Sequence, residues 1–363
     1  MELLMRRRRP WSLRWKTEVE RLGPPPTVTH DRTVARPSIA RTRQVTVTRV
    51  ICGVDVSSTS LEAFVGSAGP GCSFANTSEG IAELAAFCRQ HEVELVALEA
   101  TGGYEKRPFA LLWAQSVPVS ILNPRAVRDF AKSMGLLEKT DRIDARIIAR
   151  FASVKGSAPC VPLSKRQEHL KALVTHLRQL TQLHVSQQNQ GLLVTDKAVQ
   201  SSIAKVLKML ASQKRSLAAK IAAVVASDPM WQQLDQAFRS IKGVADRTVA
   251  AVMADMPEIG TLSNKAVAKL AGLAPLAQDS GKKHGKRPVR GGRRQLRAVL
   301  FVVAGVVARH HPDFVAFQQR LSAAGKPKRV IRVALAHKLL VRLNAKAREV
   351  RLQFATAHAA QIA

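Results

Sequence analysis

Acidic residues are scarce in this sequence. Its 363 residues include 57 lysines and arginines but only 26 aspartates and glutamates, so the formal net charge is +31 and the pI is about 11.2. Such a surface attracts polyanions, and nucleic acid is the first candidate because neutralising its phosphates releases counterions. An anionic membrane surface is the competing polyanion.

Aromatic residues and cysteines are also few. Aromatic side chains make up only 4% of the chain, which argues against binding dominated by base stacking and favours contact with phosphates. The four cysteines lie far apart without a CxxC pair. They indicate reduced thiols in a cytosolic protein rather than a zinc site or a disulfide framework.

Long apolar runs are absent. The longest, Ala298–Ala308, is about half the ~20 residues that a membrane span needs. The first residues, MELLMRRRRPW, are charged but lack a following apolar segment, so no signal peptide is expected. We therefore expect a cytoplasmic protein without a membrane partner.

Residues 1–48 form a basic, proline-bearing leader. No hydrophobic period is sustained in it, so it is expected to be disordered. It can be a phosphate-binding arm, and an over-extended reading frame explains it equally well.

Strand-like and helix-like segments follow the leader. Strands are expected at residues 49–56, 61–66, 72–76, 94–98 and 118–122, and helices at 78–91, 105–116, 124–134 and from Asp141 onward. The first three strands are joined by short turns and predict an antiparallel meander. Alternation of strands and helices afterwards predicts an α/β sheet with helices on its faces.

Four acids stand at special places in this pattern. Asp55 ends the first strand and Glu99 ends the fourth, and acids are uncommon in strands. Asp141 and Asp144 lie one helical turn apart on one face. Because strand ends of an open α/β sheet border its ligand crevice, the four carboxylates can converge.

Each acid also has an ordinary structural explanation. Asp55 can cap a turn, Glu99 can pair with Lys106 or Arg107, and the two aspartates can favour a helix N-terminus. Their coincidence in this order favours a site. Oxygen ligands of this kind suit Mg²⁺ or Mn²⁺, and two such ions about 4 Å apart serve phosphodiester chemistry.

Four segments carry a resemblance to a known family. GVDVSSTS, ALEATGGYE, NPRAVRDFAKSMG and KTDRIDARIIARF resemble the catalytic domain of DEDD-type insertion-sequence transposases, the family (insertion-sequence family one-ten) of the Piv DNA invertase and the bridge-RNA-guided recombinases. The resemblance implies a RuvC-like, ribonuclease-H-type domain at residues 49–156. It makes Asp55, Glu99, Asp141 and Asp144 the catalytic, metal-binding acids.

Residues 157–235 are expected to be helical. Leucines recur at helical spacing in Ser164–Gln190, and a similar stripe runs through Ser201–Ala226. Two such rods predict a helical hairpin that packs on itself or on another subunit. The resemblance implies a coiled coil used in assembly, and hence a dimer or tetramer.

Residues 236–363 are expected to form a mainly helical DNA-binding domain. Phe238–Leu262 resembles a helix-hairpin-helix, in which Lys242 and Gly243 would approach DNA phosphate. Ala245 stands where the usual second glycine would be, so a plain turn between two helices is the alternative.

The chain after Asn264 contains only three acids and includes an irregular basic stretch, Pro275–Gly292. Ser280 stands in this stretch, where composition alone favours a loop hydroxyl; the resemblance makes Ser280 a nucleophile. The candidate nucleic-acid-binding residues around it are Lys282, Lys283, Lys286, Arg287, Arg290, Arg293, Arg294 and Arg297.

These features together predict a transposase or site-specific recombinase of an insertion sequence. It would use the metal-binding acids and Ser280, contributed by one subunit or by different ones. The resemblance implies a guide RNA encoded by the element, although the residues are equally compatible with DNA alone. Two alternatives stay open: a nuclease that resolves Holliday junctions with water, and a non-catalytic DNA-binding protein. The paired aspartates argue against an actin-like ATPase.

Overall fold

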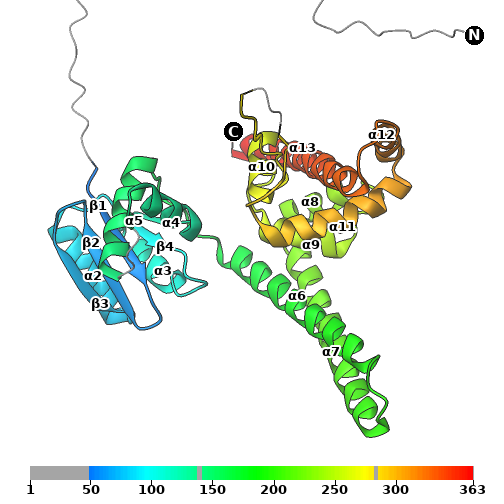
Figure 1. Cartoon of the computed structure of the whole chain (residues 1–363), viewed down its shortest axis with the longest axis horizontal. Coiled ribbons are helices and arrows are strands. Elements are labelled where there is room, and N and C mark those ends of the chain that lie inside the picture. The colour runs from blue at the N-terminus through cyan, green and yellow to red at the C-terminus, as the bar shows by residue number, and fades with distance from the viewer. Residues whose placement is uncertain (1–48, 137–140, 282–284, 363) are drawn as a thin grey trace, which may run out of the picture.

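The computed structural model describes residues 49–136, 141–281 and 285–362, without the side chains of residues 141–143 and 358–362. The leader expected at residues 1–48 lies outside the described residues. An α/β part comes first, and an all-helical part follows it (Figure 1).

The α/β part is built on a mixed sheet. Its strands are β1 (Ile51–Val56), β2 (Ser60–Val65), β3 (Gly71–Ala75), β4 (Leu95–Glu99) and β5 (Val119–Leu122). They lie in the order β3-β2-β1-β4-β5. β1, β2 and β3 pair antiparallel, whereas β4 pairs parallel to both β1 and β5. The predicted meander and the predicted βα alternation are both confirmed.

Helices cover both faces of the sheet (Figure 1). They are α2 (Ser78–Gln90), α3 (Lys106–Ala114), α4 (Pro124–Ser133) and α5 (Asp141–Lys155). Alternate residues of each strand face opposite sides, so one hydrophobic cluster joins β1, β2 and β4 to α2 and α3. A second cluster on the other face joins Ile51, Leu95 and Leu122 to α4 and α5.

Two long helices, α6 (Lys165–Gly191) and α7 (Lys197–Ala226), pack side by side as a hairpin (Figure 1). Ser164 and Asp196 cap their N-termini by accepting backbone N–H groups. Leu180, Leu210 and Leu217 form their shared core. The sequence predicted a hairpin here, and the structure packs the two helices on each other within one chain.

The remaining helices form the C-terminal part. They are α8 (Pro229–Arg239), α9 (Asp246–Asp255), α10 (Asn264–Ala271), α11 (Arg294–His310), α12 (Pro312–Ala323) and α13 (Lys328–Ile362). The largest hydrophobic cluster joins all six with the first turns of α6 and the end of α7. Asn344 of α13 is fully buried and holds the loop after α9, since its side-chain oxygen accepts from the Gly260 amide at 2.8 Å.

Within the described residues, no single helix is long and apolar enough to cross a membrane. α11 and α12 meet that test only as a pair bent by 102°. Leu296, Leu300 and Ala304 of α11 are fully buried in the hydrophobic cluster, which is the environment of a core helix.

The element boundaries lie within a few residues of those predicted from the hydrophobic periods. The sheet and its covering helices fit a RuvC-like domain followed by a helical C-terminal part.

Candidate active site

The ends of β1 and β4 place two acids side by side. Ile51 and Leu95 face α5, and two-residue alternation along each strand puts Asp55 and Glu99 on that same face. The parallel register pairs Val54 with Leu98. One residue further on, Asp55 stands opposite Glu99 on strands about 4.8 Å apart.

A third acid comes from α5, which lies unusually close to β1. A Cβ on Gly53 would lie 2.1 Å from the Ala145 carbonyl oxygen and 2.4 Å from the Ala149 nitrogen, so only glycine permits this approach. Ala145 and Ala149 are themselves small and buried. The tight crossing carries the neighbouring residue, Asp144, to the strand ends.

The three carboxylates line one cavity of about 260 Å³. The residues around it are Asp55, Val56, Glu99, Thr101, Pro124, Val127, Arg128, Ala131, Asp144 and Ile147. They come from β1, β4 and the turn after it, α4 and α5, and span residues 55 to 147 of the sequence. The fold therefore brings three carboxylate residues from separate elements into one cavity.

Carboxylate oxygens are the ligands that Mg²⁺ and Mn²⁺ prefer. The donor set therefore fits such an ion by ligand type. Across the described part of the chain, however, no three Asp, Glu, His or Cys side chains lie close enough to hold one ion. Asp141 begins α5, but its side chain lies outside the described part.

Ser280 is exposed on a loop of the helical part. Asp279 ties this loop together, because its carboxylate accepts from the Gly285 amide at 3.1 Å and from the Arg287 guanidinium at 3.2 Å. The Leu276 amide donates to the Pro288 carbonyl at 2.9 Å below it. The sequence predicted a role for Ser280, which stays a prediction, and gave no sign of the contacts of Asp279 beyond its place before the serine.

The structure does not bring Ser280 to the acids. Ser280 does not line their cavity, and its loop emerges beside α10, apart from the sheet (Figure 1). A single copy in this arrangement therefore separates the predicted nucleophile from the predicted metal ligands.

Two family models match the chain. A transposase model matches residues 52–197, and the model of the transposase IS116/IS110/IS902 family matches residues 235–319. Together they span more than half of the chain, including the acid cavity and the Ser280 loop. The chain belongs to this transposase family. It is accordingly an enzyme of the DNA transposase and recombinase class.

Relatives extend the similarity to most of the chain. The pilin gene-inverting proteins of Moraxella lacunata and Moraxella bovis are 26% and 27% identical over 308 residues, covering 81% of this chain and 94% of theirs. An uncharacterised 43.6 kDa protein of insertion element IS110 from Streptomyces coelicolor is 32% identical over 127 residues, covering 34% of this chain and 30% of that one.

RuvC of Thermus thermophilus is among the solved structures that match, with 18% sequence identity. The match covers 31% of this chain and 99% of RuvC, with a TM-score of 0.23. A TM-score of this size supports no conclusion about the transposase.

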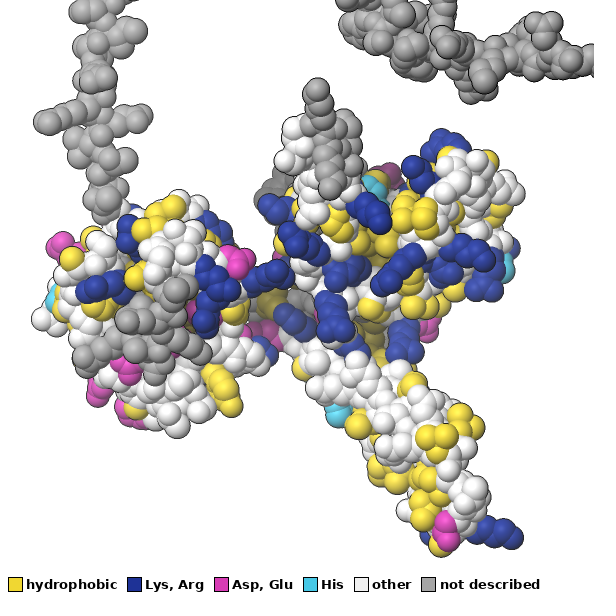
Figure 2. All heavy atoms as spheres, viewed as in Figure 1, with side chains coloured by type: hydrophobic (Ala, Val, Ile, Leu, Met, Phe, Trp, Pro, Cys, Tyr) yellow, Lys and Arg dark blue, Asp and Glu magenta, His cyan; other side chains and the backbone are white. Residues whose placement is uncertain are grey.

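Positive charge gathers on the helical part of the transposase (Figure 2). Its exposed lysines and arginines include Lys242, Lys286, Arg287, Arg290, Arg294, Arg309, Arg320, Lys326, Lys328 and Arg329. Lys282 and Lys283, also predicted to bind nucleic acid, lie outside the described residues. The exposed set offers many cationic groups to phosphates.

Two of the predicted nucleic-acid-binding arginines have internal partners. Arg293 donates to both carboxylate oxygens of Glu258, at 2.7 and 2.5 Å. Arg297 donates to the carbonyl oxygens of Gly291 and Gly272, at 2.5 and 3.3 Å. These contacts hold the C-terminal end of the Ser280 loop against the loop after α9 and the C-terminal end of α10. Sequence spacing could not distinguish such arginines from exposed ones.

Lys242 and Gly243 lie in the short turn between α8 and α9. Gly243 has a φ of +103°, and a Cβ there would lie 3.1 Å from the Val307 nitrogen of α11. Lys242 is exposed beside it. Glycine is therefore required by backbone conformation and by close packing, whether or not the turn also contacts DNA.

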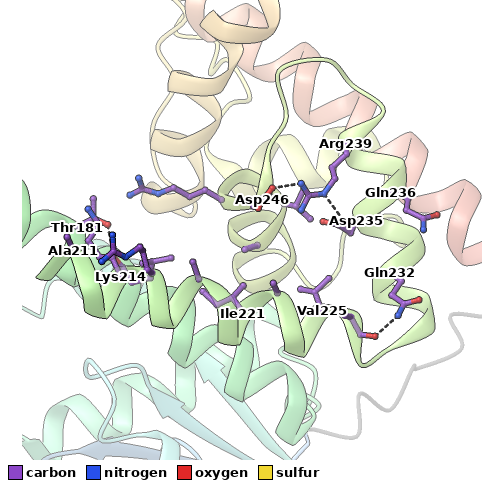
Figure 3. Close-up of a pocket in the computed structure, with 18 residues that line it drawn as sticks. Thr181, Ala211, Lys214, Ile221, Val225, Gln232, Asp235, Gln236, Arg239 and Asp246 are labelled. Carbon is purple, nitrogen blue, oxygen red and sulfur yellow. Dashed lines mark hydrogen bonds and ion pairs between the residues drawn. The ribbon is translucent and has the colours of Figure 1, made fainter. Parts of the chain in front are cut away.

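A second cavity, of about 660 Å³, lies between α7 and the α8–α9 pair (Figure 3). Its floor is apolar and includes Ile221 and Val225. At its rim, Arg239 bonds to Asp235 at 2.7 Å and also to Asp246. The hydrogen bond from Arg239 lowers the pKa of Asp246. Arg239 therefore engages both carboxylates at the rim of this cavity.

Proposed function

We propose that this transposase cuts and rejoins DNA, with Asp55, Glu99, Asp141 and Asp144 holding divalent metal and Ser280 as the nucleophile. The observation that carries the proposal is the shared cavity of Asp55, Glu99 and Asp144, which come from distant segments. Bound Mg²⁺ or Mn²⁺, two ions per site, would supply charge stabilisation at the reacting phosphate.

The proposed covalent step starts at Ser280. Its Oγ attacks phosphorus while the bond from phosphorus to the 3′-oxygen breaks, and the hydroxyl proton leaves to a base as the 3′-oxygen gains one. The products are a 5′-phosphoserine ester and a free 3′-hydroxyl. Attack by a 3′-hydroxyl on that ester reseals the strand and releases the serine, so rejoining needs no ATP.

Separation of Ser280 from the acids supports a site assembled between subunits. The exposed apolar side chains at the far end of the α6–α7 hairpin offer a surface for such an assembly. Leu183, Leu192, Leu193 and Met209 are 53%, 83%, 85% and 56% exposed there. We propose a dimer or tetramer formed through this hairpin as a coiled coil, with DNA and an element-encoded guide RNA on the basic surface. In use it would be associated with the nucleoid.

The experiment that tests the acid site compares Asp144→Asn with the wild type on plasmid DNA carrying the element's flanks. Strand cleavage in Mg²⁺ should fall by roughly 10²- to 10³-fold or more, since a charge aimed at the reacting centre is lost. DNA binding should persist. Asp129→Asn is the control, because Asp129 is an exposed acid of α4 paired with Arg125 outside the cavity. Full activity of Asp144→Asn would remove the proposal.

A mixing experiment tests assembly between subunits. Ser280→Ala and Asp144→Asn should each be inactive alone, yet a mixture should recover part of the activity, because a mixed assembly contains one site with both intact groups. No recovery in assemblies shown to be mixed would place both groups in one subunit.

The position of Ser280 also favours a second candidate, a nuclease that uses water at the acid cavity. That enzyme would resolve Holliday junctions and would leave DNA ends without protein. The recombinase would leave the phosphate bound to protein, whereas the nuclease would leave it on a protein-free DNA end. A denaturing gel distinguishes the two products.

A further inference from the structure

Thr101 lines the acid cavity, and its side-chain hydroxyl has no hydrogen-bond partner within the described part of the chain. Thr101 follows Glu99 by two residues and lines the same cavity as the three acids. Its Oγ1 is shielded from solvent and has no partner among the described residues. A buried hydroxyl left unpaired destabilises the folded state, so a group of this kind calls for an explanation.

The backbone around Thr101 is held firmly. Glu105 accepts from the Thr101 amide at 3.1 Å and from the Gly103 amide at 2.8 Å with one carboxylate oxygen. Gly102 and Gly103 have φ values of +81° and +135°, which permit the tight turn. On the other side, the Ala100 amide donates to the Leu122 carbonyl of β5 at 3.1 Å. The hydroxyl is therefore held in place by a built turn.

A phosphodiester in this cavity would need hydrogen-bond donors. Ionised carboxylates only accept hydrogen bonds, and the non-bridging phosphate oxygens also only accept. Two of the lining residues carry a side chain that can donate: Thr101 has its hydroxyl, and Arg128, an exposed residue of α4, has its guanidinium. They complement the charge of a phosphate that the acids would otherwise repel.

We propose that Thr101 contacts the substrate: its hydroxyl donates a hydrogen bond to a non-bridging oxygen of the phosphodiester that is cut. This inference rests on the proposed function, because it takes the acid cavity as the place of cleavage. Thr101 would thus position the scissile phosphate in the cavity that Arg128 also lines.

Thr101→Val removes the hydroxyl and keeps the shape, whereas Thr101→Ser keeps the hydroxyl. Thr101→Val should melt at or above the wild-type temperature, because no hydrogen bond of the free protein is lost. Its cleavage rate should fall by roughly 10- to 100-fold, the effect of losing a hydrogen bond to a charged group. Thr101→Ser should recover most of the rate. A clear drop in melting temperature for Thr101→Val would instead assign the hydroxyl a structural role and overturn the inference.

Sulfur substitution at the scissile phosphate tests the contact itself. Once the cut position is mapped with the wild type, each of the two phosphorothioate diastereomers is placed there. One diastereomer should lower the cleavage rate of the wild type, because sulfur accepts hydrogen bonds poorly. The same diastereomer should not lower the cleavage rate of Thr101→Val below its rate on unmodified DNA. Equal slowing of both proteins by each diastereomer would contradict the contact, since independent effects add.

Asp144→Asn separates this inference from the function on which it rests. If Asp144→Asn is inactive and Thr101→Val cleaves at the wild-type rate, only the role of Thr101 is wrong. If Asp144→Asn cleaves normally, the acid cavity is not the site and both proposals are overturned.

Discussion

Gly53 of β1 touches the backbone of Ala145 in α5. A Cβ on Gly53 would lie 2.1 Å from the Ala145 carbonyl oxygen, a distance that no real pair of such atoms adopts. The contact sets the distance of α5 from the sheet, and Asp144 immediately precedes Ala145 in that helix. Because Gly53 has no side chain, β1 and α5, which are about 90 residues apart in the sequence, can meet at one acid site.

Gly53→Ala is therefore expected to push α5 away from β1. The free energy of unfolding should fall by about 1–3 kcal/mol or more, the usual cost of overpacking, and DNA cleavage should be lost with it. Gly191→Ala in α6 is the matched control, because a Cβ there would only make an ordinary contact with Ile203 at 3.4 Å. Thermal melting and cleavage assays measure both effects. If Gly53→Ala melts and cleaves DNA like the wild type, α5 can move away from β1 without cost and the prediction is wrong.

Exposed basic residues of the Ser280 loop should behave differently from basic residues with internal partners. Lys286→Gln and Arg290→Gln should each weaken DNA binding, reduce the slope of log affinity against log salt by about 1, and leave the melting temperature unchanged. Arg293→Gln should lower the melting temperature, because Glu258 loses its partner. Salt titrations of DNA binding, with melting curves of the same samples, separate the two groups. Identical profiles for Arg290→Gln and Arg293→Gln would contradict this division.

The pair of Glu258 and Arg293 also predicts a dependence of stability on pH. Partial burial is the largest single influence on the pKa of Glu258 and raises it. The hydrogen bonds and charge of Arg293, a backbone hydrogen bond and the charge of Lys171 together outweigh burial, so the net pKa lies below its usual value. A carboxyl with a lower pKa in the folded state stabilises the fold above its unfolded pKa, about 4.3. That contribution disappears as the pH falls through the folded pKa.

Melting temperature should therefore fall on acidification below about pH 4.3, and fall less steeply in Glu258→Gln, which cannot titrate. Differential scanning calorimetry from pH 6 to pH 3 measures this. Parallel pH curves for the wild type and Glu258→Gln would mean that the pair contributes no such dependence.

Much of the fold and part of the site followed from the sequence. Asp55 and Glu99 were identifiable because strands and helices differ in hydrophobic period and because strand ends seldom carry acids. Two-residue alternation could even have placed both acids on the face that α5 covers. The sequence pattern also located the helical hairpin.

Other features depend on contacts that no local pattern encodes. The partner of Arg293 lies 35 residues away, and the close approach at Gly53 depends on how α5 crosses β1. The place of Thr101 beside the acids depends on how β4, α4 and α5 pack together. The separation of Ser280 from those acids is likewise a property of the folded chain.

Denaturing gel electrophoresis of labelled DNA after incubation with the transposase and Mg²⁺ tests the central claim most directly. The wild type should give a band shifted by the mass of the protein and released by protease. That band should be absent with Ser280→Ala and with Asp144→Asn, while both variants still bind DNA. Cleavage by Ser280→Ala that leaves ends free of protein would make water the nucleophile and contradict a serine recombinase.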